Sequence, residues 1–463
     1  MGRQRHEPTG LAGVERPPRV RLPYVQRIKI LRDFHTGGEK ARAAGGPVCR
    51  VPIGPAWITP QFVFVTSPQG ARDVLAGFDG SIDKEMIVHI QTRLLGMNVF
   101  DMAHEQWKAR RLALQPIFTK QHVGGYVTHM AGEAERVAAE CIRDDRVDLD
   151  HQARRLTLQV LGRSVLGLDL GPRAAALAPH FHTALNYIAR RSLSPVRAPT
   201  WLPTLARTRF RTALGALQGV ADEAIAACRA DPTHHAELIR KLIDTIDPDT
   251  NEPLTDQNIR EELIAFLIAG HDTTATTLAY SLWQLGHHRD LQERVATEVR
   301  AIGDRSLTVA DIPRLAYTVQ VIHETLRLCP PAAAVGRLTM RDVLIDGHRV
   351  PAGTNVLVGI YALHRDPDLW EQPTRFDPDR FCPARSAGRD RWQYLPFGAG
   401  PRSCIGDHFA MLEATIGLAS IIRLARVESL EPDFPLAVPF TMTAGAPIPA
   451  RITPRPPATH PSA

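Results

Sequence analysis

The residue best suited to do chemistry is Cys404, which lies in the loop Phe397-Gly-Ala-Gly-Pro-Arg-Ser-Cys-Ile-Gly406. The stretch that begins at Asp407 reads as a helix. Because the start of a helix carries a positive dipole end and unbonded N–H groups, it stabilises a thiolate. A thiolate held in this way is a natural axial ligand for a haem iron. A buried structural cysteine is the alternative, but the glycines, which let backbone approach a flat ligand, and the cation Arg402 argue against it.

A second group of polar residues interrupts a long apolar segment, residues 263–283. This segment is apolar nearly all round, which predicts a buried helix. Its middle holds two small residues, Ala269 and Gly270, which we expect to open space beside the helix. An acid and two alcohols follow, namely Asp272, Thr273 and Thr274. Burying such groups costs free energy unless they are bonded. They therefore indicate either a functional site or a satisfied polar cluster that bends the helix.

Composition narrows the class of protein. The chain has 463 residues, of which 44% are hydrophobic, and this is enough to enclose a cofactor and a pocket. Its six scattered cysteines form no CxxC pair, which excludes a disulfide framework and an iron–sulfur or zinc site. The net charge of +6 comes without a nucleic-acid motif, so we expect an acidic protein partner and no nucleic acid. With no long apolar segment and no signal-like h-region, the sequence predicts no transmembrane anchor and a soluble, cytoplasmic protein.

The pattern along the chain predicts a mainly α fold with a smaller β region. Residues 103–328 are largely helical, whereas strand-like runs occur at residues 47–67 and again after Pro330. We expect a single large domain over residues 23–455. A disordered basic leader at residues 1–22 and a disordered tail at residues 456–463 are expected to flank it.

The cysteine loop resembles the haem-binding signature of the cytochrome P450 superfamily, in which Phe, Gly, Arg, Cys and Gly recur at fixed offsets. These positions are Phe397, Gly400, Arg402, Cys404 and Gly406, with Gly398 beside them and Ala410 and Glu413 matching the following helix. The resemblance covers residues 45–455. It implies the cytochrome P450 fold, in which haem b is enclosed between the long central helix and the cysteine-loop helix, with Cys404 as the axial ligand of the iron.

The run Ala269-Gly-His-Asp-Thr-Thr274 resembles the oxygen-activation motif of the same family. The resemblance implies that Ala269 and Gly270 border the haem, that Thr273, beside Thr274, hydrogen-bonds dioxygen, and that Asp272 relays protons. His271 fills a variable position, and we expect it to be a packing or surface residue.

The family also supplies expectations for residues outside these two motifs. A buried structural triad of Glu324, Arg327 and Arg380 would hold the segment before the cysteine. Haem propionates would be held by Arg402, Arg337, Trp107 and Arg111, although each cation could instead be a solvated surface charge. The substrate pocket would be lined by Met97, Val99, Phe100, Ala265, Phe266, Ala333, Val335 and Ile448. Because these lining residues are apolar, a hydrophobic substrate is expected.

The resemblance implies a haem-thiolate monooxygenase that hydroxylates or epoxidises a hydrophobic small molecule of the terpenoid, sterol, fatty-acid or polyketide class. The sequence has no flavin or NAD motif, so electrons would come from a separate ferredoxin and ferredoxin reductase, docking on Lys108, Arg110 and Lys120. Two alternatives remain open. One is a peroxide-driven or isomerising haem-thiolate enzyme, against which the Asp272–Thr273 pair argues. The other is a non-catalytic haem-binding sensor, which would tolerate Thr273→Ala.

Overall fold

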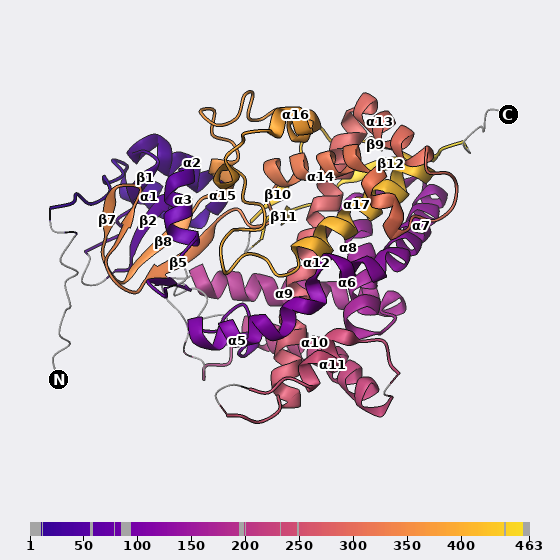
Figure 1. Ribbon diagram of the computed structural model, residues 1–463, viewed down its shortest axis with the longest axis horizontal. Coiled ribbons are helices and arrows are strands. Elements are labelled where there is room, and N and C mark those ends of the chain that lie inside the picture. The colour runs from indigo at the N-terminus through magenta and orange to yellow at the C-terminus, as the bar shows by residue number, and fades with distance from the viewer. Residues whose placement is uncertain are drawn as a thin grey trace. The chain divides into compact units, whose positions relative to one another are not determined.

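The chain forms two compact units, each built from segments that are distant in sequence. The computed structural model describes residues 11, 13–55, 59–77, 79–84, 94–193, 199, 201–231, 233–247, 250–438 and 441–456. The first unit comprises Met1–Ile90, Ala332–Arg375 and Gly388–Cys404. The second comprises Gln91–Pro331, Phe376–Ala387 and Ile405–Ala463. Helices predominate in the part of the chain that the structure describes, as the sequence predicted, and the sheets are small (Figure 1).

The first unit is organised around a five-stranded sheet in the order β1-β2-β8-β5-β3. Its strands are β1 Val48–Arg50, β2 Gln61–Val65, β3 Ile82–Asp83, β5 Val335–Thr339 and β8 Thr354–Val358. Strand β8 lies in the centre, pairs in parallel with β2, and is buried at all its positions. The helices of this unit are α1 Tyr24–Arg32, α2 Phe34–Gly45, α3 Pro68–Leu75 and α15 Ile360–Leu363.

A separate hairpin of the first unit joins β6 Val343–Ile345 to β7 His348–Val350. Its two turn residues, Asp346 and Gly347, both have positive φ, at 46° and 76°. This is the backbone that a two-residue hairpin loop requires, and Asp-Gly is the dipeptide that adopts it most easily.

The folded part of the first unit includes Val20, which the sequence placed in the disordered leader. The Val20 side chain is 5% exposed, and its N–H donates to the Arg50 carbonyl at 2.9 Å. Arg19 forms a parallel bridge with Arg50. The arginines and prolines around Val20 give this stretch a composition typical of disordered segments. The buried Val20 side chain and two backbone hydrogen bonds with Arg50 nevertheless attach it beside β1.

The second unit is mostly helical. Its helices are α5 His104–Leu114, α6 Lys120–Val123, α7 Val127–Asp144, α8 Leu149–Leu161, α9 Ala174–Leu193, α10 Leu205–Ala230, α11 Glu237–Ile243, α12 Asp256–His287, α13 Arg289–Arg300, α14 Ala316–Leu328, α16 Pro383–Ser386 and α17 Asp407–Leu424. Short 3₁₀ turns include η6 Pro378–Phe381. One small sheet has the order β4-β12-β9, and a two-stranded one pairs β10 with β11. The strands are β4 Arg146–Asp148, β9 Ala425–Ser429, β10 Leu436–Ala437, β11 Thr443–Ala444 and β12 Pro449–Pro454.

Helix α12 is the centre of the second unit. It begins at a capping box, in which the Thr255 hydroxyl accepts from the Asn258 N–H at 3.2 Å and the Asn258 side chain accepts from the Thr255 N–H at 3.3 Å. The helix then packs against α8, α10, α14 and α17, which explains why its sequence is apolar on all sides. None of the helices in the described ranges combines the length and the apolar character needed to span a bilayer.

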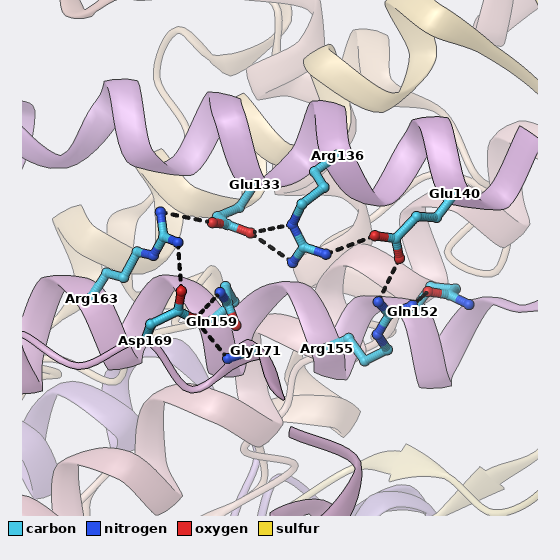
Figure 2. Close-up of polar contacts among 9 residues, drawn as sticks. All are labelled: Glu133, Arg136, Glu140, Gln152, Arg155, Gln159, Arg163, Asp169 and Gly171. Atoms are coloured by element: carbon cyan, nitrogen blue, oxygen red, sulfur yellow. Dashed lines mark hydrogen bonds and ion pairs between the residues drawn. The ribbon is translucent and has the colours of Figure 1, made fainter. Parts of the chain in front are cut away.

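A chain of ion pairs links α7 to α8 (Figure 2). The charges alternate in sign in the order Arg163, Glu133, Arg136, Glu140 and Arg155, with N–O distances of 3.2, 2.7, 2.8 and 2.5 Å. Several of these side chains are part-exposed, so each pair contributes little free energy. They join α7 to Arg155 on α8 and to Arg163 in the π turn Gly162–Leu166 that follows α8.

Candidate functional site

The cysteine loop is a tight turn whose shape is set by two glycines. The Cys404 N–H donates to the Phe397 carbonyl at 2.9 Å, and the Ser403 N–H donates to the Gly400 carbonyl at 3.1 Å. Gly398 and Gly400 have φ of 67° and 72°, which is the left-handed region that favours glycine. These bonds and dihedral angles place Cys404 at the end of the turn, directly before α17.

Gly400 is required for a second reason, because the loop lies against the end of α3. A Cβ at Gly400 would lie 1.8 Å from the carbonyl oxygen of Leu75, which is a backbone atom that cannot rotate away. Gly400→Ala therefore combines an unfavourable φ with a collision. We expect it to lower the free energy of unfolding by more than about 3 kcal/mol and to reduce haem content.

Gly388→Ala is the matched control for this prediction. Gly388 has a φ of 78° and open space around its Cβ position, so alanine there carries the conformational cost alone, about 1 kcal/mol. Urea denaturation of both variants measures the difference. If both variants lost the same free energy of unfolding, the contact with Leu75 would not constrain the loop.

Cys404 differs from the other cysteines in its exposure. Of the six, it is the exposed one, whereas the others are buried or half-buried. Gly406 caps the 18-residue helix α17, so the thiol precedes a long helix N-terminus by two residues. A Cβ at Gly406 would come no nearer than 4.0 Å to its closest neighbour, Phe118, so protein packing alone does not demand glycine there. An accessible thiol beside a helix N-terminus fits a thiolate that ligates a metal.

Two of the expected propionate cations lie in the first unit. Arg402 forms an ion pair with Asp83, whose Oδ1 lies 2.9 Å from its Nη2. Arg337 lies on β5, is buried, and donates from Nη1 to the Gly336 carbonyl at 2.8 Å. Asp83 is a residue that sequence reasoning missed. It is 319 positions from Arg402, and the pairing of β3 with β5 brings it beside Leu338, the neighbour of Arg337.

The other two expected propionate residues lie in the second unit. Trp107 is buried and Arg111 is half-buried, and both lie on α5, one turn apart. The Trp107 ring also contacts His104, with ring centroids 5.9 Å apart. The spacing inferred from the sequence therefore corresponds to one face of a real helix.

The middle of α12 has one accessible face. Between Leu263 and Ser281 most residues are buried, but Ile268, Ala269, Gly270 and Thr273 are partly exposed, and Ala269 and Thr273 lie one turn apart. The Thr273 hydroxyl donates to the Ala269 carbonyl at 2.8 Å. Ala269 and Thr273 thus present a small accessible surface that carries one hydroxyl group. A flat cofactor that binds a small ligand needs such a surface beside it.

Gly270 lies beside α8. A Cβ there would lie 3.0 Å from the Leu161 side chain of α8. Its small size therefore permits the close approach of α8 to α12, which pack together extensively. Spacing alone did not show that Gly270 faces α8.

Asp272 is buried and has specific partners. Its Oδ1 accepts from Arg154 Nη1 on α8, and its Oδ2 accepts from the Thr441 hydroxyl at 2.8 Å. Arg154 is shared with Asp150, whose Oδ2 lies 2.7 Å from Nε. Burial by itself would raise the pKa of Asp272, but the charge and hydrogen bond of Arg154 outweigh it, and the pKa lies below its usual value. Asp272 is therefore held as a carboxylate in the structure.

The two neighbours of the Asp272–Thr273 pair face other elements. His271 is fully buried, and its Nδ1 lies 3.0 Å from the Thr157 hydroxyl. Burial lowers the pKa of His271 to about 3, so the imidazole is neutral and acts in helix packing. Thr274 is also buried and faces Glu413 of α17; burial raises the pKa of Glu413 well above its usual value, which the Thr274 hydroxyl only partly offsets. Thr274 thus lies between α12 and α17.

The three charged residues of the expected triad are brought together in the interior of the second unit. Arg327 Nε lies 2.7 Å from Glu324 Oε2, and Arg380 Nε lies 3.3 Å from Glu324 Oε1. The Asp377 N–H also donates to Glu324 Oε1 at 2.9 Å. Since all three charged side chains are buried, the carboxylate neutralises two guanidinium groups that solvent cannot reach.

Removing the charge of Glu324 is expected to be costly. Glu324→Gln leaves Arg327 and Arg380 buried without their counter-charge, which should lower the free energy of unfolding by about 3–5 kcal/mol. Asp379→Asn is the control, because Asp379 pairs with Arg294 on the surface, where such pairs contribute about 0–1 kcal/mol. A loss for Glu324→Gln no larger than that of the control in urea denaturation would contradict the prediction.

The expected pocket residues are divided between the two units. In the second, Val99, Ala265 and Phe266 are buried, and the Phe266 ring contacts Phe100 with centroids 5.7 Å apart. Met97 is 44% exposed.

The remaining pocket residues lie elsewhere. Ile448 is fully buried, with its N–H bonded to Asp148 Oδ1 at 2.9 Å. In the first unit, Ala333 is buried and Val335 half-buried.

One expectation about the redox-partner surface is wrong. Lys108 and Lys120 are exposed, as a docking surface requires. Arg110 is only 3% exposed, because its Nη1 lies 2.7 Å from Glu262 Oε1 on α12. On a helix, Lys108 and Arg110 point about 200° apart, and the short sequence pattern did not show which of them faces the core.

Comparison with known proteins gives independent information on the family and the fold. A family model described as Cytochrome P450 matches residues 17–448. Cyclooctatin synthase of Streptomyces melanosporofaciens is 34% identical over 331 residues, which is 71% of this chain and 72% of that protein. Pentalenene oxygenase of Streptomyces avermitilis is 30% identical over 394 residues, 84% of this chain and 86% of that protein. The solved structure of retinoic acid bound cyanobacterial CYP120A1 has a TM-score of 0.83 and 24% identity, covers 96% of this chain and 100% of its own, and shows the fold alone.

Proposed function

The chain belongs to the cytochrome P450 family, and from that premise we propose that it is a haem-thiolate monooxygenase that binds haem b and oxygenates a hydrophobic terpenoid. The observation that carries the proposal is the accessible Cys404 thiol, presented by a glycine turn at the N-terminus of α17. The reaction balances as substrate C–H plus dioxygen, two electrons and two protons, giving C–OH and water. The electrons would come from a ferredoxin and its reductase.

A haem with a thiolate ligand supplies the redox centre at which dioxygen is reduced and cleaved. The residues of this chain would then have separate duties. Cys404 would ligate the iron, while Arg402, Arg337, Trp107 and Arg111 would hold the propionates by charge and hydrogen bonding. Ala269 would leave room on the accessible face of α12.

Proton supply would fall to Thr273 and Asp272. The Thr273 hydroxyl can exchange its bond to the Ala269 carbonyl for one to a ligand, because both lie on the accessible face of α12. Asp272 can accept a proton when either Arg154 or Thr441 releases one of its carboxylate oxygens. Proton delivery would therefore be coupled to a rearrangement of that ion pair.

The terpenoid class is supported by the relatives, two of which are named for cyclooctat-9-en-7-ol and pentalenene. The apolar residues Val99, Phe100 and Phe266 agree with such a substrate.

The test begins with the reduced holoenzyme and carbon monoxide, where the red-shifted Soret band of a thiolate-ligated haem is expected. Pentalenene, cyclooctat-9-en-7-ol, a fatty acid and a macrolide are then titrated while the haem spin state is recorded. We expect the two cyclic alkenes to give the low-to-high-spin shift, and product to form only with NAD(P)H, ferredoxin and reductase. Efficient turnover with peroxide alone would overturn the monooxygenase assignment, and a shift only with the fatty acid or the macrolide would overturn the substrate class.

A further inference from the structure

Two adjacent glutamates near the start of α12 bind the backbone of a segment that precedes α5. Glu261 Oε2 accepts from the Met97 N–H at 2.8 Å, and Glu262 Oε2 accepts from the Val99 N–H at 3.0 Å. The two acceptors are neighbours in sequence, and the two donors are separated by one residue. Together they hold a short bent segment, which continues into a turn at Val99 and Phe100, against the helix.

Glu262 is the buried member of this pair. Its side chain is 0% exposed, and its second oxygen, Oε1, lies 2.7 Å from Arg110 Nη1 on α5. Arg110 Nη2 also approaches Asp247 Oδ2 at 3.6 Å. A fully buried carboxylate with a guanidinium on one oxygen and a backbone N–H on the other is a satisfied group, and losing either partner would be costly.

Gly96 lies against the Glu261 side chain of α12 in a backbone conformation that favours glycine. Gly96 has a φ of 86°, and a Cβ there would lie 2.0 Å from Cδ of Glu261. This contact involves the same Glu261 carboxyl group that accepts from the Met97 N–H. The positive φ of Gly96 and this hydrogen bond together bring the segment against the glutamates.

The segment carries the apolar residues that were assigned to the substrate side. Val99 is buried, and Phe100 makes an edge contact with Phe266, which lies on α12 one turn after Glu262. The Phe266 ring also stacks on Phe118, with centroids 5.3 Å apart. Whatever fixes the backbone at Val99 therefore fixes this apolar wall.

We propose that Glu261 and Glu262 form an acidic clasp that fixes residues 96–100 on α12 and so sets the position of the apolar wall Val99–Phe100–Phe266 against which substrate binds. Glu262 is a positioning residue, and Arg110 is its counter-ion. The inference rests on the proposed function only for the statement that this wall belongs to the substrate pocket.

The clasp has a defined pH dependence. Burial raises the pKa of Glu262 from 4.5 to about 7, against the opposing effects of Arg110 and the Val99 N–H, while Glu261 raises it further. Because a solvated carboxyl keeps the lower pKa, closing the clasp takes up a proton. The closed clasp is therefore most stable below pH 4.5 and loses stability as the pH rises towards 7, above which it stays constant.

Hydrogen exchange of the holoenzyme tests the clasp directly. Exchange at Met97 and Val99, corrected for the intrinsic rate at each pH, should accelerate about 70-fold between pH 5 and pH 8. In Glu262→Gln, which cannot ionise, the corrected rate should change by less than about twofold over that range. Glu252→Gln is the matched control, since it removes the same charge from an exposed position shortly before α12 and should leave the wild-type profile unchanged.

Azole binding tests the assignment of the wall to the pocket. Glu262→Ala should weaken 4-phenylimidazole about tenfold, because the ligand must then order residues 96–100 itself. Imidazole, which lacks the phenyl group, should change by less than about twofold. If Glu262→Ala does not fold, the double variant Glu262→Gln, Arg110→Gln is tested in its place. This double variant removes both buried charges together, so neither is left without its counter-charge.

The outcomes separate the two proposals. Loss of the thiolate carbon monoxide band in the wild type would overturn the proposed function and leave the exchange test valid. A pH-independent exchange rate at Val99 in the wild type would overturn the clasp. A normal exchange result with equal effects on 4-phenylimidazole and imidazole would overturn its role in positioning the pocket wall.

Discussion

Cys404→Ser is expected to abolish the red-shifted carbon monoxide band of the reduced protein and to reduce monooxygenase turnover to background. A serine hydroxyl remains protonated where a thiol beside a helix N-terminus ionises, so it does not replace the thiolate ligand. The substitution is nearly isosteric, and the bond from the backbone N–H of residue 404 to the Phe397 carbonyl does not involve the side chain. The loop should therefore keep its shape while its chemistry is lost.

Cys382→Ser is the control for this result. Cys382 is half-buried and lies before the cysteine loop, so its replacement should leave the spectrum unchanged. Absorbance spectroscopy of the reduced, carbon monoxide-treated proteins measures both variants. If Cys404→Ser kept the red-shifted band, the iron would have another thiolate ligand and the central claim about Cys404 would fail.

Asp272→Asn is expected to slow product formation by about 10²–10⁴-fold and to increase the solvent deuterium isotope effect, because an amide does not relay the proton. The carbon monoxide band should be unaffected, since Asp272 lies on α12 and not in the cysteine loop. The fold should also survive. Arg154 keeps its ion pair with Asp150 at 2.7 Å after the change, so its charge is not left alone in the interior.

Asp150→Asn distinguishes a proton-transfer defect from a structural one. It removes the other carboxylate of Arg154 and leaves Asp272 in place, so turnover should fall by less than about threefold. Product formation and NAD(P)H consumption, measured in light and heavy water, report the difference. Equal losses in the two variants, with no change in the isotope effect, would show that Asp272 acts only by holding Arg154.

The sequence alone predicted the features that depend on residues close together in the chain. The order of residues around Cys404 predicted a glycine turn followed by a helix, and the structure has α17 beginning at Asp407. The apolar composition of residues 263–283 predicted a buried helix, which is α12. Turns, caps and periodicity depend on neighbours a few positions away, so they can be read directly from the chain.

The partners of these residues were decided by tertiary structure alone. Arg154 on α8 supplies the counter-charge of Asp272 from 118 positions away, and Asp83 reaches Arg402 through the pairing of β3 with β5. Arg110 was expected on the surface and lies in the core beside Glu262. A lone charged residue has the same sequence signature whether it is solvated or paired, because pairing depends on packing between distant elements. The sequence by itself therefore determined which residues can carry the chemistry of this protein, and only the packing of α5, α8 and α12 and the pairing of β3 with β5 decided which charges hold them in place.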